Sequence, residues 1–159
     1  MKYTFTSALF SPCEKYRYTL RRQWDSDDLR QVNFICLNPS TADGEKDDNT
    51  IRKCVKFANA WGFGRLVITN LFAWRSTDWS VLKKVDEPVG FHNDHWLFSE
   101  AQSSELVIAA WSQDGKINGR SQAVRHMLRH VKLHYLRMSA EPWHPLYLPD
   151  STLPTEWER

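Results

Sequence analysis

Three polar side chains lie where apolar, strand-like runs of the sequence give way to loops, and each could contact a ligand. Asn38 follows the apolar run of residues 32–37, Asn70 lies near the end of a second such run, and His144 lies in a late loop. A carboxamide offers donors and an acceptor, which suits the amide edge of a pyrimidine or purine. An imidazole can donate to a developing anion or act as an acid or base. The ordinary alternatives are turn-forming asparagines and a histidine packed on a neighbouring tryptophan.

Carboxylates crowd the loop of residues 38–48. A carboxylate here can hold a water molecule for attack or bind a divalent cation. We assign Asp47 as the alternative to Asn38 for holding the attacking water, whereas Asp48 is better placed to cap the helix that follows. The four acidic side chains of this loop are Asp43, Glu45, Asp47 and Asp48.

Two histidines, His92 and His95, stand three residues apart at the start of an expected helix. This spacing allows them to share a metal ion. No second cluster at ligand spacing accompanies them, so neither a metal nor another cofactor is predicted. A metal-dependent hydrolase or base-modifying enzyme that uses them with Asp47 and Asp48 remains an alternative.

The segment of residues 116–137 is basic, with six Lys or Arg, three His and no Asp or Glu. A helix face of this kind can follow a phosphate backbone, although a merely solvated face is the common alternative. The candidate contacts to a nucleic-acid backbone are Lys116, Arg120, Arg125 and Arg129.

The elements that must position these residues alternate between strands and helices. Buried strands are expected at residues 32–37, 65–73, 105–111 and 133–138, and helices at 51–62, 93–103 and 120–131. This alternation predicts a three-layer α/β/α sandwich around a mainly parallel four-stranded sheet. Residues 1–24 are expected to add a β-hairpin and residues 149–159 a tail, within a single domain of residues 1–159. Ligands of open α/β sheets sit at the carboxyl ends of the strands, where these polar loops fall.

The composition is that of a globular protein. The chain has 159 residues, of which 42% are hydrophobic and 25% charged, and a net charge of +2. No apolar run is long enough for a membrane span, and the first residues lack a signal-peptide core. The three cysteines have no metal or redox spacing, which fits reduced thiols. We expect a cytoplasmic protein without membrane contact.

Nearly the whole chain resembles a family of bacterial and phage proteins, the domain-of-unknown-function family 1643, because several sequence motifs of that family occur here in the same order. These are L-N-P-S-T-A-D at residues 37–43, D-D-N-T-I-R-K-C at 47–54, W-G-F-G at 61–64, T-N-L-F-A-W-R at 69–75, N-D-H-W-L at 93–97, A-A-W at 109–111 and H-P-L-Y-L at 144–148. The family brings no established activity.

A second likeness is to the uracil-DNA glycosylase superfamily, which has an α/β/α fold. The C-L-N-P run ending at Pro39 is similar to its water-positioning loop, I-T-N ending at Asn70 to its base-reading strand end, and H-P-L starting at His144 to its late loop. The chain departs from that pattern at Cys36, where a glycine is usual, and at Leu146, where a serine is usual.

The first hypothesis is therefore a nucleobase-recognising, glycosylase-like enzyme that cleaves an N-glycosidic bond or processes modified bases in DNA. Asn38 or Asp47 would hold water and His144 would stabilise the departing base, which an aromatic side chain would stack against. A non-catalytic nucleic-acid or nucleotide-binding module is the second hypothesis. The expected substrate contacts are Pro39, Ser40, Thr41, Asn70, Trp74, Arg75, Trp111 and Leu146.

Overall fold

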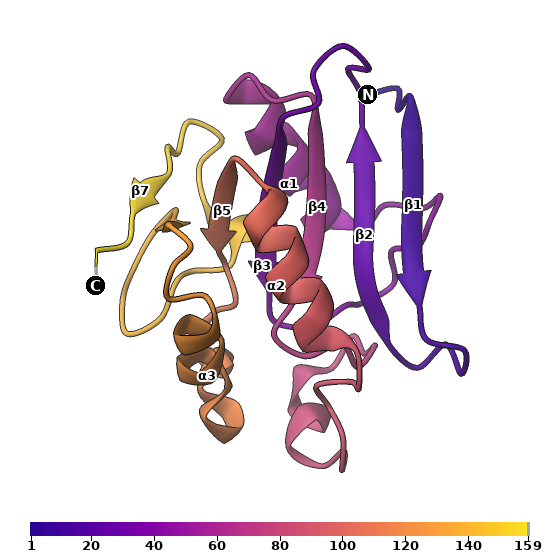
Figure 1. Cartoon of the computed structure of the whole chain (residues 1–159), viewed down its shortest axis with the longest axis vertical. Helices are drawn as coiled ribbons and strands as arrows, with labels where there is room; N and C mark the ends of the chain where they lie inside the picture. The colour runs from indigo at the N-terminus through magenta and orange to yellow at the C-terminus, as the bar shows by residue number, and fades with distance from the viewer. Residues whose placement is uncertain (159) are drawn as a thin grey trace.

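The four expected apolar runs form parallel strands at the centre of one sheet (Figure 1). The computed structural model describes residues 1–158. Neighbouring central strands follow the order β4-β3-β5-β6, and all three pairings between them are parallel. Their bounds are β3 at Gln31–Cys36, β4 at Arg65–Asn70, β5 at Leu106–Ala109 and β6 at Leu133–Tyr135. β3 is buried along its whole length, as expected for a strand covered on both faces.

Three antiparallel strands extend this centre, so the sheet has seven strands and not the four expected. β1 (Phe5–Phe10) and β2 (Arg17–Gln23) form the expected hairpin, and β2 pairs with the outer edge of β4. At the opposite edge, β7 (Thr155–Glu156) pairs with β6, in a segment expected to be a tail. Both additions cover strand edges that would otherwise present unpaired backbone groups.

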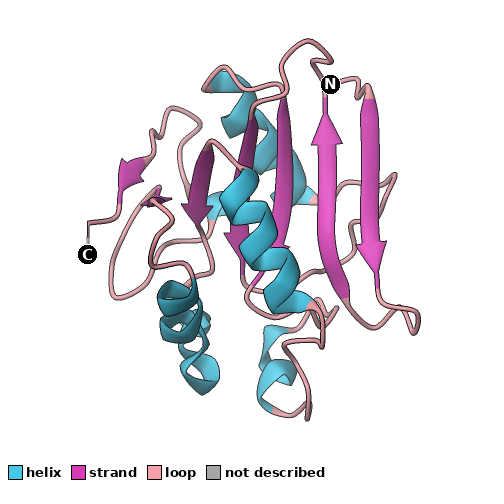
Figure 2. Cartoon of the chain, viewed as in Figure 1, coloured by secondary structure: helices cyan, strands magenta, loops and turns pink. Residues whose placement is uncertain are grey.

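Helices cover both faces of the sheet (Figures 1 and 2). α1 (Asn49–Ala60) lies behind the sheet in this view, whereas α2 (Asn93–Ser103) and α3 (Arg120–Met127) lie in front. Each face has its own apolar core. The helix expected at residues 93–103 is confirmed, and α3 is shorter than expected because the chain leaves the helix after Met127. Among the described residues, no helix combines the length and apolar character needed to cross a membrane.

The topology gathers several loops at one edge of the sheet. The connection from β3 leads through α1 to β4 on one side, whereas that from β5 leads through α3 to β6 on the other. Adjacent strands whose connections diverge in this way leave a crevice at their carboxyl ends. In Figure 1 the arrow of β5 points downward, so this edge is the lower one.

A buried arginine in β2 fixes the loop that leads into α1. Arg22 is 0% exposed, and its Nε donates to Asp47 Oδ1 at 2.8 Å. Its Nη2 donates to the carbonyl oxygens of Asp43 and Lys46 at 2.5 and 3.3 Å. A buried charge requires this degree of pairing. The arrangement ties the hairpin to the acidic loop and so sets where α1 begins.

Replacing Arg22 with methionine should destabilise the protein by about 3 kcal/mol or more, because Asp47 and two carbonyl groups lose their donor in a buried place. Urea unfolding followed by circular dichroism measures this loss. Arg129→Met, at an exposed position just after α3, is the control. It should change the free energy of unfolding by less than about 0.5 kcal/mol. Equal effects of the two substitutions would contradict the role given to Arg22.

Candidate functional site

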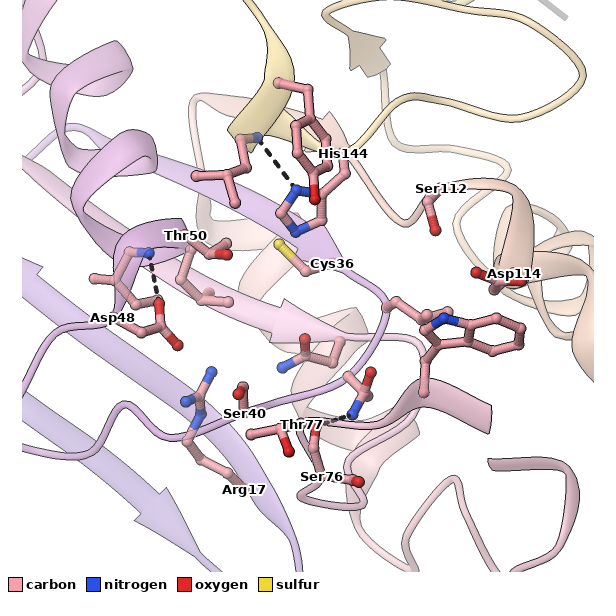
Figure 3. A pocket seen from close by; sticks show the side chains of 18 residues that line it. Arg17, Cys36, Ser40, Asp48, Thr50, Ser76, Thr77, Ser112, Asp114 and His144 are labelled. Carbon is pink, nitrogen blue, oxygen red and sulfur yellow. Dashed lines mark hydrogen bonds between the residues drawn. The ribbon is translucent and has the colours of Figure 1, made fainter. Parts of the chain in front are cut away.

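A cavity of about 450 Å³ opens at the carboxyl ends of β3 and β4 (Figure 3). Its volume lies within the range of small-molecule sites. The loop after β5, the beginning of α1 and the late loop before residue 148 complete its walls. The side chains that line the cavity include Arg17, Asn38, Ser40, Asp48, Asn70, Trp79, Ser112, Asp114, His144, Leu146 and Tyr147.

Asn70 carries an unpaired carboxamide at the cavity. The residue is 1% exposed, and neither Oδ1 nor Nδ2 has a hydrogen-bond partner among the described residues. Its backbone is held in place because Asn93 Nδ2 donates to the Asn70 carbonyl oxygen at 2.9 Å. Leaving both polar atoms of a buried amide unpaired costs stability. A ligand with one donor and one acceptor would satisfy both atoms at once.

Arg17, at the start of β2, is a second side chain with unused polar atoms. Its Nη1 donates to the carbonyl oxygen of Ala42 at 2.9 Å, while its buried Nε has no partner within residues 1–158. Burial lowers the pKa of Arg17 to about 10, and the nearby charge of Asp48 opposes that shift. The guanidinium therefore remains charged at neutral pH and gives the cavity a desolvated positive group.

Asp48 and His144 bring a carboxylate and an imidazole to the same cavity (Figure 3). Asp48 Oδ1 caps α1 by accepting the Ile51 N–H at 2.9 Å, which leaves Oδ2 for a ligand or water. His144 Nδ1 accepts the Leu146 N–H at 3.2 Å, so the neutral ring carries its proton on Nε2. Burial lowers the pKa of His144, and Asp48 opposes this. The imidazole is thus a neutral hydrogen-bond donor at pH 7.

The rim of the cavity combines aromatic side chains with a strained turn. Trp79 and Tyr147 are 42% and 79% exposed. Ser112 lines the wall with a φ of 67°, a conformation that costs energy in a residue other than glycine. Its N–H donates to the Pro142 carbonyl oxygen at 2.9 Å, which joins the loop after β5 to the loop that carries His144.

Asn38, expected to hold the attacking water, lines the cavity but is partly committed. Its Nδ2 donates to the Ser76 carbonyl oxygen at 2.9 Å and to the Pro39 carbonyl oxygen at 3.2 Å. The Pro39 carbonyl also accepts the Ser76 N–H at 2.9 Å. Asn38 and Pro39 therefore fasten the end of β3 to the segment after β4, and the Asn38 side chain offers only its oxygen to a ligand.

Asp47, the other candidate for holding water, does not line the cavity. Its Oδ1 accepts from Arg22 and its Oδ2 accepts from the Tyr3 hydroxyl at 2.5 Å. Both burial and this bond to Asp47 raise the pKa of Tyr3. Of the four acidic side chains of this loop, Asp48 is the one that lines the cavity, because Asp47 points toward the hairpin.

The expected substrate contacts divide into three groups. Asn70 and Leu146 line the cavity, and Ser40 lies on the boundary with a second hollow. The second hollow contains Thr41, Trp74 and Arg75. Pro39 and Trp111 line neither hollow.

Trp111 belongs to the core and not to the cavity. It is 0% exposed, and its Nε1 donates to Glu141 Oε2 at 2.7 Å. Ser121 donates to the other oxygen of Glu141 at 2.9 Å. Trp111 and Ser121 thus anchor the loop that carries His144, and the structure places Trp111 in the core, outside the cavity wall.

The basic segment does not form one exposed row. Arg120 is buried, donating to the Leu71 carbonyl oxygen at 2.8 Å and to Asp94 at 2.5 Å. Arg125 lies over the ring of Trp157, with its Cζ 4.0 Å from the centroid. Lys116 and Arg129 are exposed. In this structure the Arg120 guanidinium therefore binds groups within the protein.

The histidine pair at the start of α2 makes ring contacts. His92 packs edge-on against Tyr18, and His95 does the same against Trp96. Within the described part of the chain, no group of three or more His, Cys, Asp or Glu side chains is arranged to hold a metal ion. The structure therefore does not unite the two histidines with the acidic loop in a ligand set.

Sequence reasoning missed Arg17, Trp79, Ser112 and Asp114 as parts of the site. Arg17 is the first residue of β2, and because β2 runs antiparallel to β4, the start of β2 lies near the end of β4. The Arg17 N–H donates to the carbonyl oxygen of Ala73, just after β4, at 2.9 Å. The sequence signal that could have pointed to Arg17 is its charge at the start of the strand-forming run R-Y-T-L. Asp114 and Ser112 lie in a polar loop that the sequence placed correctly but did not assign a role.

The chain has an α/β fold with a cavity at the carboxyl edge of its parallel strands. The sequence pattern of the family described as "Protein of unknown function (DUF1643)" matches residues 17–146. The chain belongs to this family. The matched segment begins with Arg17 and ends with Leu146, and it contains every lining residue named above except Tyr147. Searches of curated proteins and of solved structures found no significant match.

Replacing Asn70 with leucine should raise the free energy of unfolding by about 1 kcal/mol, because two unpaired buried polar atoms are replaced by apolar ones of similar size. The matched variant is Asn93→Leu, whose wild-type Nδ2 donates to the Asn70 and Leu71 carbonyl oxygens. It should lower stability by about 2 kcal/mol because those carbonyls lose their donor. Urea unfolding measures both changes. A large loss of stability in Asn70→Leu would contradict the prediction, because it would show that the Asn70 side chain stabilises the fold.

The depressed pKa of His144 should make the protein less stable in acid. The unfolded chain binds a proton at this residue near the ordinary value of 6.5, whereas the folded chain binds it only at lower pH. Stability should therefore fall as pH drops from about 7.5 to 5. His144→Asn, which keeps an acceptor for the Leu146 N–H, should lose less stability over that range. Exposed His130→Asn is the control; identical pH profiles for His144→Asn and wild type would refute this.

Proposed function

We propose that this chain binds a nucleobase in the cavity and hydrolyses the N-glycosidic bond that joins the base to its sugar. One observation carries the proposal. The unpaired carboxamide of buried Asn70 shares a cavity with the carboxylate of Asp48 and the neutral imidazole of His144. Base recognition, water activation and stabilisation of a leaving anion need these three kinds of group.

Recognition of the base would use the two free atoms of Asn70. Oδ1 accepts an N–H and Nδ2 donates to a carbonyl of the base edge, as amide edges of pyrimidines and purines require. A base that lacks this pair would leave the buried amide unsatisfied and bind poorly. Trp79 and Tyr147 on the rim offer aromatic surfaces for stacking.

Cleavage breaks the bond between the sugar C1′ and the base nitrogen, and the electron pair leaves with the base. The oxygen of a water molecule bonds to C1′, and one proton of this water passes to Asp48 Oδ2. The side-chain oxygen of Asn38 orients the water. Negative charge develops on the base, where the Nε2–H of His144 and the guanidinium of Arg17 stabilise it. The base then takes a proton from solvent. The products are a free base and a sugar with a hydroxyl group at C1′.

Asp48→Asn and His144→Asn should each slow base release at least about 100-fold, which is the usual contribution of general acid–base groups. The asparagine at position 48 still caps α1, so circular dichroism spectra and unfolding midpoints should stay close to wild type. Asp27→Asn, at an exposed turn position, should keep full activity.

The assay is mass spectrometry of oligonucleotides and nucleosides that carry normal, deaminated and modified bases. A released base with an abasic product supports the proposal and identifies the base. Release at wild-type rates by both the Asp48 and His144 variants would contradict the assigned chemistry. Binding without release from any substrate would leave a nucleobase-binding module in place of an enzyme.

A further inference from the structure

A second hollow of about 450 Å³ adjoins the cavity. The two share Ser40, Ser76 and Thr77 as lining residues, so they lie next to each other. The other residues of the second hollow are Glu14, Lys15, Thr41, Trp74 and Arg75. The second hollow is therefore the neighbouring surface for a ligand that extends beyond the cavity.

The turn of the N-terminal hairpin builds one wall of this hollow and is held rigidly. Glu14 has a φ of 60°, which closes the turn tightly. The Arg75 N–H donates to the Lys15 carbonyl oxygen, and Arg75 Nη1 donates to the Glu14 carbonyl oxygen, both at 2.9 Å. Ser11 Oγ accepts the Tyr16 N–H at 3.2 Å. The turn of the hairpin thus gives the second hollow a preformed wall.

The chemistry of the hollow suits a sugar-phosphate group. Lys15 is exposed, and Arg75 is fixed with its Cζ 4.5 Å from the centroid of the Phe10 ring. Ser40 lines both hollows and Thr41 lines the second one, so both residues bring hydroxyl groups to it. Cationic and hydroxyl side chains are the usual partners of phosphate and sugar oxygens. Trp74 supplies an aromatic surface of the kind on which bases of single strands stack.

We infer that the second hollow holds the nucleotide next to the target base, so the substrate is a nucleic-acid strand and not a free nucleoside. The inference rests on the proposed nucleobase pocket and adds its substrate class. Lys15 and Arg75 contact the phosphate that links the two nucleotides. The carboxylate of Glu14 opposes that phosphate and limits the affinity. The strand leaves the cavity past the hairpin, away from the segment after α3 that carries Arg129.

Binding of a short fluorescein-labelled single-stranded DNA, followed by fluorescence anisotropy at several salt concentrations, tests this inference. Lys15→Glu should weaken binding about tenfold and reduce the slope of log affinity against log salt by at least about 0.7, the value of one phosphate contact in single strands. Lys15→Arg should bind as wild type does. Glu14→Gln, which removes the opposing charge, should bind more tightly. Arg129→Glu, at an exposed position just after α3, is the control and should have little effect.

No strand binding, or binding that Lys15→Glu leaves unchanged, overturns the inference, as does a loss caused by Arg129→Glu alone. Base release is measured separately on the same strands. Lys15-dependent binding without base release would refute hydrolysis while the second hollow keeps its assignment. Base release that is insensitive to Lys15→Glu, with equal rates on strand and nucleoside, would support hydrolysis and refute the strand-binding role.

Discussion

The requirement that buried polar groups find partners shapes the carboxyl edge of this sheet. Three buried side chains donate hydrogen bonds to carbonyl or carboxylate oxygens: Arg22, Asn93 and Arg120. These bonds fix the acidic loop, the end of β4 and the start of α2. Asn70 and Arg17 stand within the same framework but keep buried donors or acceptors without partners among residues 1–158. A rigid surround that leaves particular groups unsatisfied is what a preorganised ligand site requires.

Much of the fold follows from local patterns in the sequence. The apolar runs identify the four central strands because a strand covered on both faces has apolar side chains on both sides. The hairpin and α2 also follow from alternation and helical spacing. β7 could not be predicted, because two residues, Thr155–Glu156, become a strand only where β6 offers a free edge. The sheet therefore has more strands than periodicity alone indicates.

The candidate site was only partly predictable, for reasons that particular residues show. Asn38, Asn70 and His144 meet because carboxyl ends of parallel strands share one edge. Asp47 and Asp48 are neighbours in sequence, yet only the loop geometry determines that Asp48 faces the cavity while Asp47 binds Arg22. Arg17 enters from an antiparallel strand, whose register no local pattern reveals.

The most direct test of the account is a titration of ¹⁵N-labelled protein with free nucleobases, followed through the side-chain amide signals of Asn70. The absence of those signals in Asn70→Leu identifies them. The account predicts that at least one base shifts both Asn70 amide protons saturably, because Nδ2 gains its missing acceptor, and that the same base leaves the Asn93 amide signals nearly unchanged. If every base in a panel of pyrimidines and purines leaves the Asn70 signals unmoved, the cavity is not a nucleobase site.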